Sequence, residues 1–81
     1  MNLYVGNVSP QTSELELRKA FAPFGDVGSI SMDEHPPDSK AYNFCFVEMP
    51  FDNQAALAIR GLDGASLGGY TLTVRESGVS V

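Results

Sequence analysis

Three aromatic residues are the side chains whose types and spacing best suit ligand chemistry. Tyr4 lies in the run LYVGNV, and Phe44 and Phe46 lie in the run YNFCFVEM. Successive strand residues point to opposite faces of a sheet, so each run places aliphatic side chains on one face and rings on the other. Such rings either belong to a second buried face or are offered to a ligand.

Catalytic and metal chemistry is disfavoured by the residues that it would need. The chain has one cysteine, Cys45, and one histidine, His35, which excludes an internal disulfide and a zinc site built from these residue types. Cys45 has no base near it in sequence, so we assign it to the core rather than to a nucleophile. The sequence also contains no Gly-rich phosphate loop and no Cys-x-x-Cys motif. We therefore predict a binding module rather than an enzyme, with no cofactor and no metal.

Alternating hydrophobic residues predict the strands that carry the rings. Four strands are expected, over residues 2–7, 27–32 and 42–49 and around Leu72 and Val74, ending near Glu76. A slip in the period near Gly28 predicts a β-bulge in the second strand. The remaining segments are expected to be an exposed loop over residues 34–41 and turns at residues 62–64 and 68–69.

Two helices are expected between these strands. Ser13 is a suitable N-cap for the first, because Glu16 follows three residues later and can close a capping box. The segment from Pro23 to Gly25 should end this helix. Asp52 is expected to cap the second helix, which should end near Gly61. The residues that this helix is expected to bury are Ala55, Ala56, Leu57 and Ile59.

The order of these elements is β-α-β-β-α-β, which predicts an α+β, ferredoxin-like sandwich. Right-handed crossovers place both helices on one face of a four-stranded antiparallel sheet. The covered face is expected to take Leu3, Val5, Ile30, Met32, Cys45, Val47, Leu72 and Val74. The rings are then left on the open face, where a contiguous apolar patch is typical of an interaction surface.

With this topology, the chain resembles the RNA recognition motif family over essentially its whole length. LYVGNV matches the short ribonucleoprotein motif of that family, apolar-aromatic-apolar-x-Asn-apolar, at every position. Residues 42–49 resemble the longer motif, K/R-G-F/Y-G/A-F-V-x-F/Y, and match it at Phe44, Phe46 and Val47. The runs FAPFG and LDG, at residues 21–25 and 62–64, are similar to further landmarks of the family.

The longer motif departs from the family pattern at four positions. Asn43 stands where glycine is usual, Cys45 where glycine or alanine is usual, and Met49 where an aromatic residue is usual. Cys45 and Met49 should face the core, where a thiol and a thioether are well accommodated. Tyr42 replaces a lysine or arginine on the open face, which removes a phosphate contact and offers a fourth ring.

The resemblance implies single-stranded RNA as the partner, with bases stacked on the rings. Arg75 should share the open face with Thr71 and Thr73, and Lys40 precedes the third strand, so both cations are candidates for contacts with RNA. The candidate RNA-binding residues are Tyr4, Phe44, Phe46, Tyr42, Lys40, Arg75 and Asn2. We expect Asn7 to hydrogen-bond a turn. The helix-borne cations, interpreted as solubility charges, are Arg18, Lys19 and Arg60.

The length and net charge of the chain limit the number of domains and the kinds of partner that we expect. The chain has 81 residues, a net charge of −5 and a pI of about 4.5. We expect one domain over residues 1–76, a frayed tail over residues 77–81, and similarity to the small single-motif proteins of bacteria. The absence of a leader or an apolar span predicts a cytoplasmic protein that does not bind membranes. The acidic charge favours an alternative, in which the same sheet face binds a protein partner or forms a weak homodimer.

Overall fold

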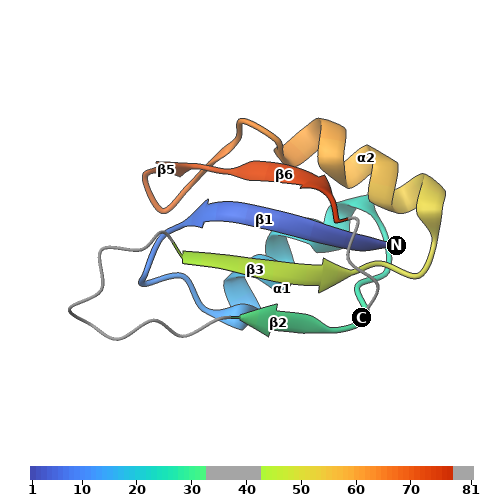
Figure 1. Ribbon diagram of the computed structural model, residues 1–81, viewed down its shortest axis with the longest axis horizontal. Coiled ribbons are helices and arrows are strands. Elements are labelled where there is room, and N and C mark those ends of the chain that lie inside the picture. Colours follow the sequence, from blue (N-terminus) through green and yellow to red (C-terminus); the bar gives the residue numbers. More distant parts are fainter. Residues whose placement is uncertain (33–42, 78–81) are drawn as a thin grey trace.

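The computed structural model describes residues 1–32 and 43–77 and confirms the ferredoxin-like α+β fold. Its sheet has four antiparallel strands in the order β2-β3-β1-β6. In Figure 1 the sheet faces the viewer, α1 lies behind it, and α2 runs along the β6 side. The elements of this sandwich are β1 (Asn2–Val8), α1 (Glu14–Phe21), β2 (Ile30–Met32), β3 (Asn43–Glu48), α2 (Asp52–Leu62) and β6 (Thr73–Glu76).

The core lies between the helices and one face of the sheet. Alternate residues of β1 and β3, such as Leu3 and Val47, are fully buried, as predicted from their period of two. Leu17 and Phe21 of α1 and Ala55 of α2 belong to the same cluster. The sheet residues at the outer strand β2, Ile30 and Met32, are packed against this core but are only half-buried. Both helices therefore cover one face, and the described residues place no helix on the other.

The start of α1 follows the prediction from the sequence. The Glu16 backbone N–H donates to Ser13 Oγ at 3.2 Å, which satisfies one of the unpaired donors of the first turn. The helix ends at Phe21 and continues as a short 3-10 helix, η1 (Ala22–Phe24), which contains Pro23. The α-helix therefore ends just before the segment from Pro23 to Gly25, as the sequence predicted.

The face of α2 was predicted only in part, because Ala55 is buried and Ile59 packs half-buried against the core, whereas the cap and the other two residues differ. Asp52 is the first helical residue rather than the N-cap, which is Phe51 and has no side-chain cap. The buried residues are Ala55 and Ala58, one turn apart, whereas Ala56 is exposed and Leu57 is 53% exposed. Residues 55–59 are all apolar, so hydrophobicity alone could not select the buried side.

The predicted irregularity at Gly28 is a β-bulge. The Gly28 N–H donates to Glu48 O and the Glu48 N–H donates to Ser29 O, both at 2.8 Å. Gly28 and Ser29 thus face one residue of β3, and regular pairing resumes with Ile30 opposite Val47. The strand β2 consequently begins at Ile30 and not at Val27.

The chain between α2 and β6 forms a small hairpin that the sequence did not predict. Its strands are β4 (Ser66–Leu67) and β5 (Tyr70–Thr71). The expected turn at Gly68 and Gly69 connects them, with φ values of 61° and 83°. Two consecutive residues with positive φ are typical of a two-residue hairpin turn, and glycine adopts them without steric cost.

Two further findings concern the C-terminal end of the described chain and the length of the helices. Ser77, which we had placed in the tail, donates its backbone N–H to Asn2 O at 2.8 Å. Residues 78–81 of the expected tail lie outside the described residues. Within the described part of the chain, neither helix has the length and apolar character needed to span a bilayer.

Candidate nucleic-acid interface

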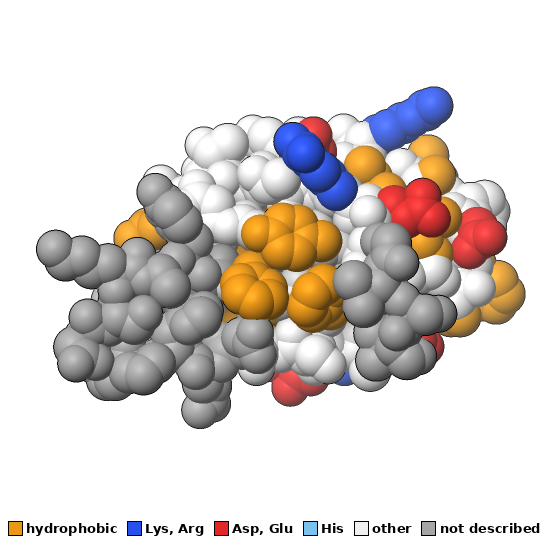
Figure 2. Space-filling view, in the orientation of Figure 1, with side chains coloured by type: hydrophobic (Ala, Val, Ile, Leu, Met, Phe, Trp, Pro, Cys, Tyr) orange, Lys and Arg blue, Asp and Glu red, His pale blue; other side chains and the backbone are white. Residues whose placement is uncertain are grey.

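Tyr4, Phe44 and Phe46 form a ring cluster on the open face of the sheet. The ring centroids are 5.9 Å apart for Tyr4 and Phe44, 6.0 Å for Tyr4 and Phe46, and 5.8 Å for the two phenylalanines. Each ring is half-buried. Figure 2 shows a compact group of hydrophobic side chains at the centre of this face. The sequence prediction that the rings share one surface is therefore matched by the geometry.

The register of β1 and β3 explains this grouping. Tyr4 lies opposite Phe46 and Gly6 lies opposite Phe44, while the residues between them point into the core. The rings of Tyr4 and Phe44 are 31° from parallel, whereas the Phe46 ring meets both others at steeper angles, 63° and 84°. Tilted and edge-to-face contacts are the favourable arrangements for aromatic pairs. The cluster thus presents π-faces whose relative positions are fixed by strand pairing.

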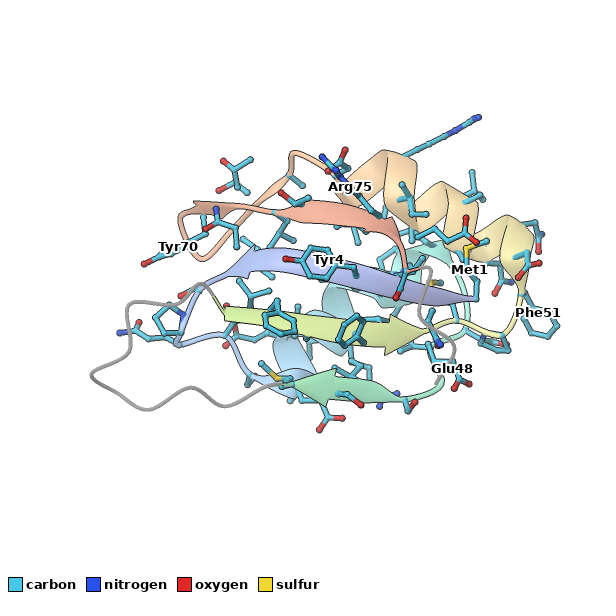
Figure 3. All side chains as sticks on the ribbon, viewed as in Figure 1. Met1, Tyr4, Glu48, Phe51, Tyr70 and Arg75 are labelled. Atoms are coloured by element: carbon cyan, nitrogen blue, oxygen red, sulfur yellow. The ribbon has the colours of Figure 1, made fainter. Side chains whose placement is uncertain are left out.

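A polar residue adjoins the ring cluster at each side of the sheet. Ser31 of β2 lies opposite Phe46, and Arg75 of β6 lies opposite Tyr4. One row therefore crosses all four strands, in the order Ser31, Phe46, Tyr4 and Arg75. Arg75 is exposed, and in Figure 3 its side chain extends from β6, the strand next to that of Tyr4, and is directed away from the Tyr4 ring. Its guanidinium group is the described cation best placed to meet a ligand on the rings.

The neighbouring row is acidic. Asn2 and Glu48 lie opposite each other at the end of β1 and β3. Glu48 is exposed, and its carboxylate lies beside Gly28, where a β-carbon would be 2.9 Å from Oε1. Asn2 is half-buried, and its backbone carbonyl is occupied by Ser77. A carboxylate at this end of the ring cluster disfavours a phosphate there.

Asn7 has the structural role that we expected. Its backbone has a φ of 59°, a left-handed conformation that asparagine tolerates better than most residues. Its side-chain Nδ2 donates to the backbone carbonyl of Thr71 at 2.8 Å. Asn7 therefore joins the end of β1 to the β4–β5 hairpin. This bond gives Asn7 a structural role that needs no ligand.

The helix-borne cations do not all behave as predicted. Lys19 and Arg60 are exposed, in agreement with their interpretation as solubility charges. Arg18 is different, because its Nη1 donates to the backbone carbonyls of Val27 and Gly28, both at 3.3 Å. Its Nη2 also lies 3.6 Å from the Glu14 carboxylate. Arg18 thus fastens α1 to the segment that leads into β2, and its interpretation as a solubility charge was wrong.

Cys45 belongs to the core, as expected. The residue is fully buried between strand neighbours, and burial raises the pKa of its thiol from 9.0 to about 11. A thiol that stays protonated at neutral pH is a poor nucleophile. Among the described residues, no group of acidic, histidine and cysteine side chains is arranged to hold a metal ion.

Several candidate residues cannot be placed. Lys40 and Tyr42, like His35 and Asp33, lie outside the described residues. The structure thus brings together Tyr4, Phe44, Phe46 and Arg75, with Asn2 in the next row. Sequence reasoning missed Gly6, which it treated as the variable position of the short motif. The signal that could have identified Gly6 is that strand pairing places it opposite Phe44, and a glycine there leaves room for a neighbouring ring.

Comparison with known proteins identifies the family. Residues 3–73 match the model of the RNA recognition motif, and the chain belongs to this family. The crystal structure of RNA Binding Protein PG1 superposes with a TM-score of 0.87 at 31% identity, covering 100% of this chain and 98% of that one.

Two relatives in sequence differ widely in length. RbpD of Nostoc sp., a provisionally named RNA-binding protein, is 36% identical over 77 residues, which are 95% of this chain and 82% of RbpD. The poly(U)-binding splicing factor hfp of Drosophila melanogaster is 39% identical over 72 residues. That match covers 89% of this chain but spans only 11% of the fly protein. The resemblance to small bacterial members of the family is thereby confirmed.

Proposed function

We propose that this chain binds single-stranded RNA by stacking bases on the ring cluster. The observation that carries the proposal is the contact of Tyr4, Phe44 and Phe46 with one another on the helix-free face of a family member. Members of this family stack two or three bases on aromatic residues of the two motifs. RNA-binding relatives support the same function at the level of the whole chain.

The proposed interface combines stacking with few ionic contacts. Base stacking is worth about 1–3 kcal/mol per base, so two or three bases give an affinity of roughly 10 μM to 1 mM after ordering costs. Arg75 supplies a contact with a phosphate or a base edge. The proposed binding unit is residues 1–76, and Asn2, Lys40 and Tyr42 are proposed as further contacts with RNA. The net charge of −5 keeps the electrostatic contribution small.

An NMR titration with short single strands tests this proposal. Pyrimidine-rich and purine-rich RNAs should shift the backbone amides of β1 and β3 and leave those on the outer sides of α1 and α2 unchanged. A self-complementary RNA duplex of equal length is the control and should give much smaller shifts, because its bases are not free to stack. Shifts confined to the helices, or none up to about 1 mM RNA, would contradict stacking on the rings.

The acidic charge favours one other occupant of the same face, which is a protein. In that case the ring cluster would be covered by a partner or by a second copy of the chain. Sedimentation at increasing protein concentration distinguishes the two functions. A tight dimer that Phe44→Ala abolishes would replace the RNA assignment, whereas a monomer with accessible rings is the expected result.

A further inference from the structure

Gly6 lies beneath the ring of Tyr4. A β-carbon at position 6 would be 2.7 Å from the Tyr4 hydroxyl oxygen, 2.8 Å from Cε1 and 3.0 Å from Cζ. Non-bonded carbon atoms in proteins prefer separations of about 3.5–4.0 Å, so no side chain fits there while the ring stays in place. Gly6 is itself buried, although it lies on the open face of the sheet. The ring of Tyr4 thus leans along β1 from its own residue onto Gly6.

This lean explains the spacing of the ring cluster. In the strand register Tyr4 lies opposite Phe46, and Gly6 lies opposite Phe44. Positions two residues apart on a strand are separated by about 6.6–6.8 Å. A Tyr4 ring standing upright over its own residue would therefore contact Phe46 and lie farther from Phe44. The observed centroid distances are instead nearly equal, 5.9 Å to Phe44 and 6.0 Å to Phe46.

We propose that Gly6 is a positioning residue for RNA, which acts by allowing the Tyr4 ring to lie between the two phenylalanines. The role in RNA binding rests on the proposed function, whereas the effect on the ring does not. Without the lean, Tyr4 and Phe44 would cease to form the tilted pair, 31° from parallel, on which neighbouring bases find adjacent faces. The glycine thereby turns two separate stacking positions into one continuous surface.

The backbone does not itself require glycine at position 6. The glycines with positive φ in the described residues are Gly25, Gly64, Gly68 and Gly69, and Gly6 is not among them. The atoms nearest to an added β-carbon all belong to the far end of the Tyr4 side chain. Alanine at position 6 should therefore displace the ring and leave the strand pairing intact. This distinguishes Gly6 from a glycine that serves only the backbone.

Gly6→Ala tests the proposal with two measurements. In NMR spectra, cross-relaxation between the Tyr4 and Phe44 ring protons should weaken relative to that between Tyr4 and Phe46. RNA affinity should fall by at least about threefold, since one base loses part of its stacking surface. Gly28→Ala is the matched control next to the same sheet, because its β-carbon would meet the flexible end of the exposed Glu48 side chain at 2.9 Å and the Glu48 carbonyl at an ordinary 3.4 Å. This control should leave the ring contacts unchanged.

A double-mutant cycle separates positioning from a general effect on the fold. Tyr4→Ala should weaken binding by about 5- to 150-fold, the loss of one stacked base. Adding Gly6→Ala to Tyr4→Ala should then change affinity by less than about twofold, because there is no ring left to displace. The melting temperatures of these two variants should also agree. This comparison stays informative even if Gly6→Ala alone is poorly folded.

The outcomes distinguish this inference from the proposed function. Unchanged ring contacts in Gly6→Ala, or a further large loss of affinity when it is added to Tyr4→Ala, would refute the positioning role. If the ring moves as expected but neither Gly6→Ala nor Tyr4→Ala alters RNA affinity, the geometry is right and the RNA function of Tyr4 is wrong.

Discussion

Arg75 lies directly opposite Tyr4 in the antiparallel pairing of β6 with β1. The same tyrosine faces Phe46 of β3 on its other side. Arg75, Tyr4 and Phe46 therefore occupy one row of paired positions across the sheet, although Tyr4 and Arg75 are 71 positions apart in the sequence. The cations of α1 and α2 have no such relation to the rings, because both helices pack on the covered face.

The first prediction concerns salt. With phosphate contacts from Arg75 and Lys40 alone, log Kd should depend on log salt concentration with a slope of magnitude about 1.4, or about 0.7 per contact. Arg75→Ala should reduce this magnitude by about 0.7, as measured by fluorescence anisotropy with a labelled single strand. Lys19→Ala is the control and should leave the slope unchanged. Arg18 is unsuitable for that purpose, because it also holds the carbonyls of Val27 and Gly28. A slope that Arg75→Ala does not alter would place the phosphates elsewhere.

The second prediction separates ring stacking from core packing. Phe46→Ala should weaken RNA binding by about 1–3 kcal/mol. Its cost in unfolding free energy should be about 1–3 kcal/mol, because the half-buried ring loses two aromatic contacts of about 0.5–1.5 kcal/mol each. Phe21→Ala, which removes a fully buried ring, should cost about 3–5 kcal/mol. Urea unfolding measures both. As a binding control, Phe51→Ala removes a ring that is 51% exposed outside the ring cluster.

If Phe46→Ala unfolds the domain as readily as Phe21→Ala does, Phe46 serves the core and the stacking function loses its central residue.

The third prediction tests the structural role of Asn7. Asn7→Ala loses the hydrogen bond to Thr71 and places a β-carbon at a φ of 59°, so it should destabilise the fold by about 2 kcal/mol. Asn7→Gly loses the bond but suits the conformation, and should cost about 1 kcal/mol. Urea unfolding of both variants gives the difference. Equal stability of all three proteins, together with a loss of RNA affinity, would show that Asn7 contacts RNA instead.

The fourth prediction concerns alkaline pH. Burial raises the pKa of the Cys45 thiol from 9.0 to about 11, so the unfolded chain releases this proton first as the pH rises. The stabilising effect of a neutral, buried thiol is complete below pH 9 and is lost as the pH rises toward 11. The loss is about 1.4 kcal/mol per pH unit over that window.

The measurement is a comparison of urea unfolding with that of Cys45→Ala, which removes every pH effect that the two proteins share. The difference in stability between the two proteins should shrink between pH 9 and pH 11. A constant difference would mean that the thiol ionises equally easily in the folded and unfolded states.

The fold could be predicted because the strands that matter have one buried face each. Leu3 and Val5 alternate with the residues between them, and Cys45 and Val47 do the same, so each pattern admits one orientation in the sheet. In α2 the five apolar residues 55–59 admit several orientations, and contacts with the sheet decide among them. The β4–β5 hairpin was missed because each of its strands has only two residues, too few for a period to be recognised.

The sequence could predict which residues form the site, but not how their side chains are arranged. Alternation places Tyr4, Phe44 and Phe46 on one face, but it says nothing about the direction in which a ring leans. That direction depends on the space that Gly6 leaves by having no side chain, and the Tyr4 ring occupies this space in the folded sheet. Arg18 was misjudged for a related reason, because the carbonyls that it binds are brought to α1 by the tertiary fold.

The β-bulge at Gly28 and Ser29 has a consequence for the behaviour of concentrated solutions. It bends and twists the chain at an outer strand of the described sheet, where another molecule could otherwise add its own strand. A distorted edge is a poor template for growth into fibrils, and a net charge of −5 makes separate molecules repel one another. Together they allow a cluster of half-buried aromatic rings on the sheet surface to be carried with a reduced risk of aggregation.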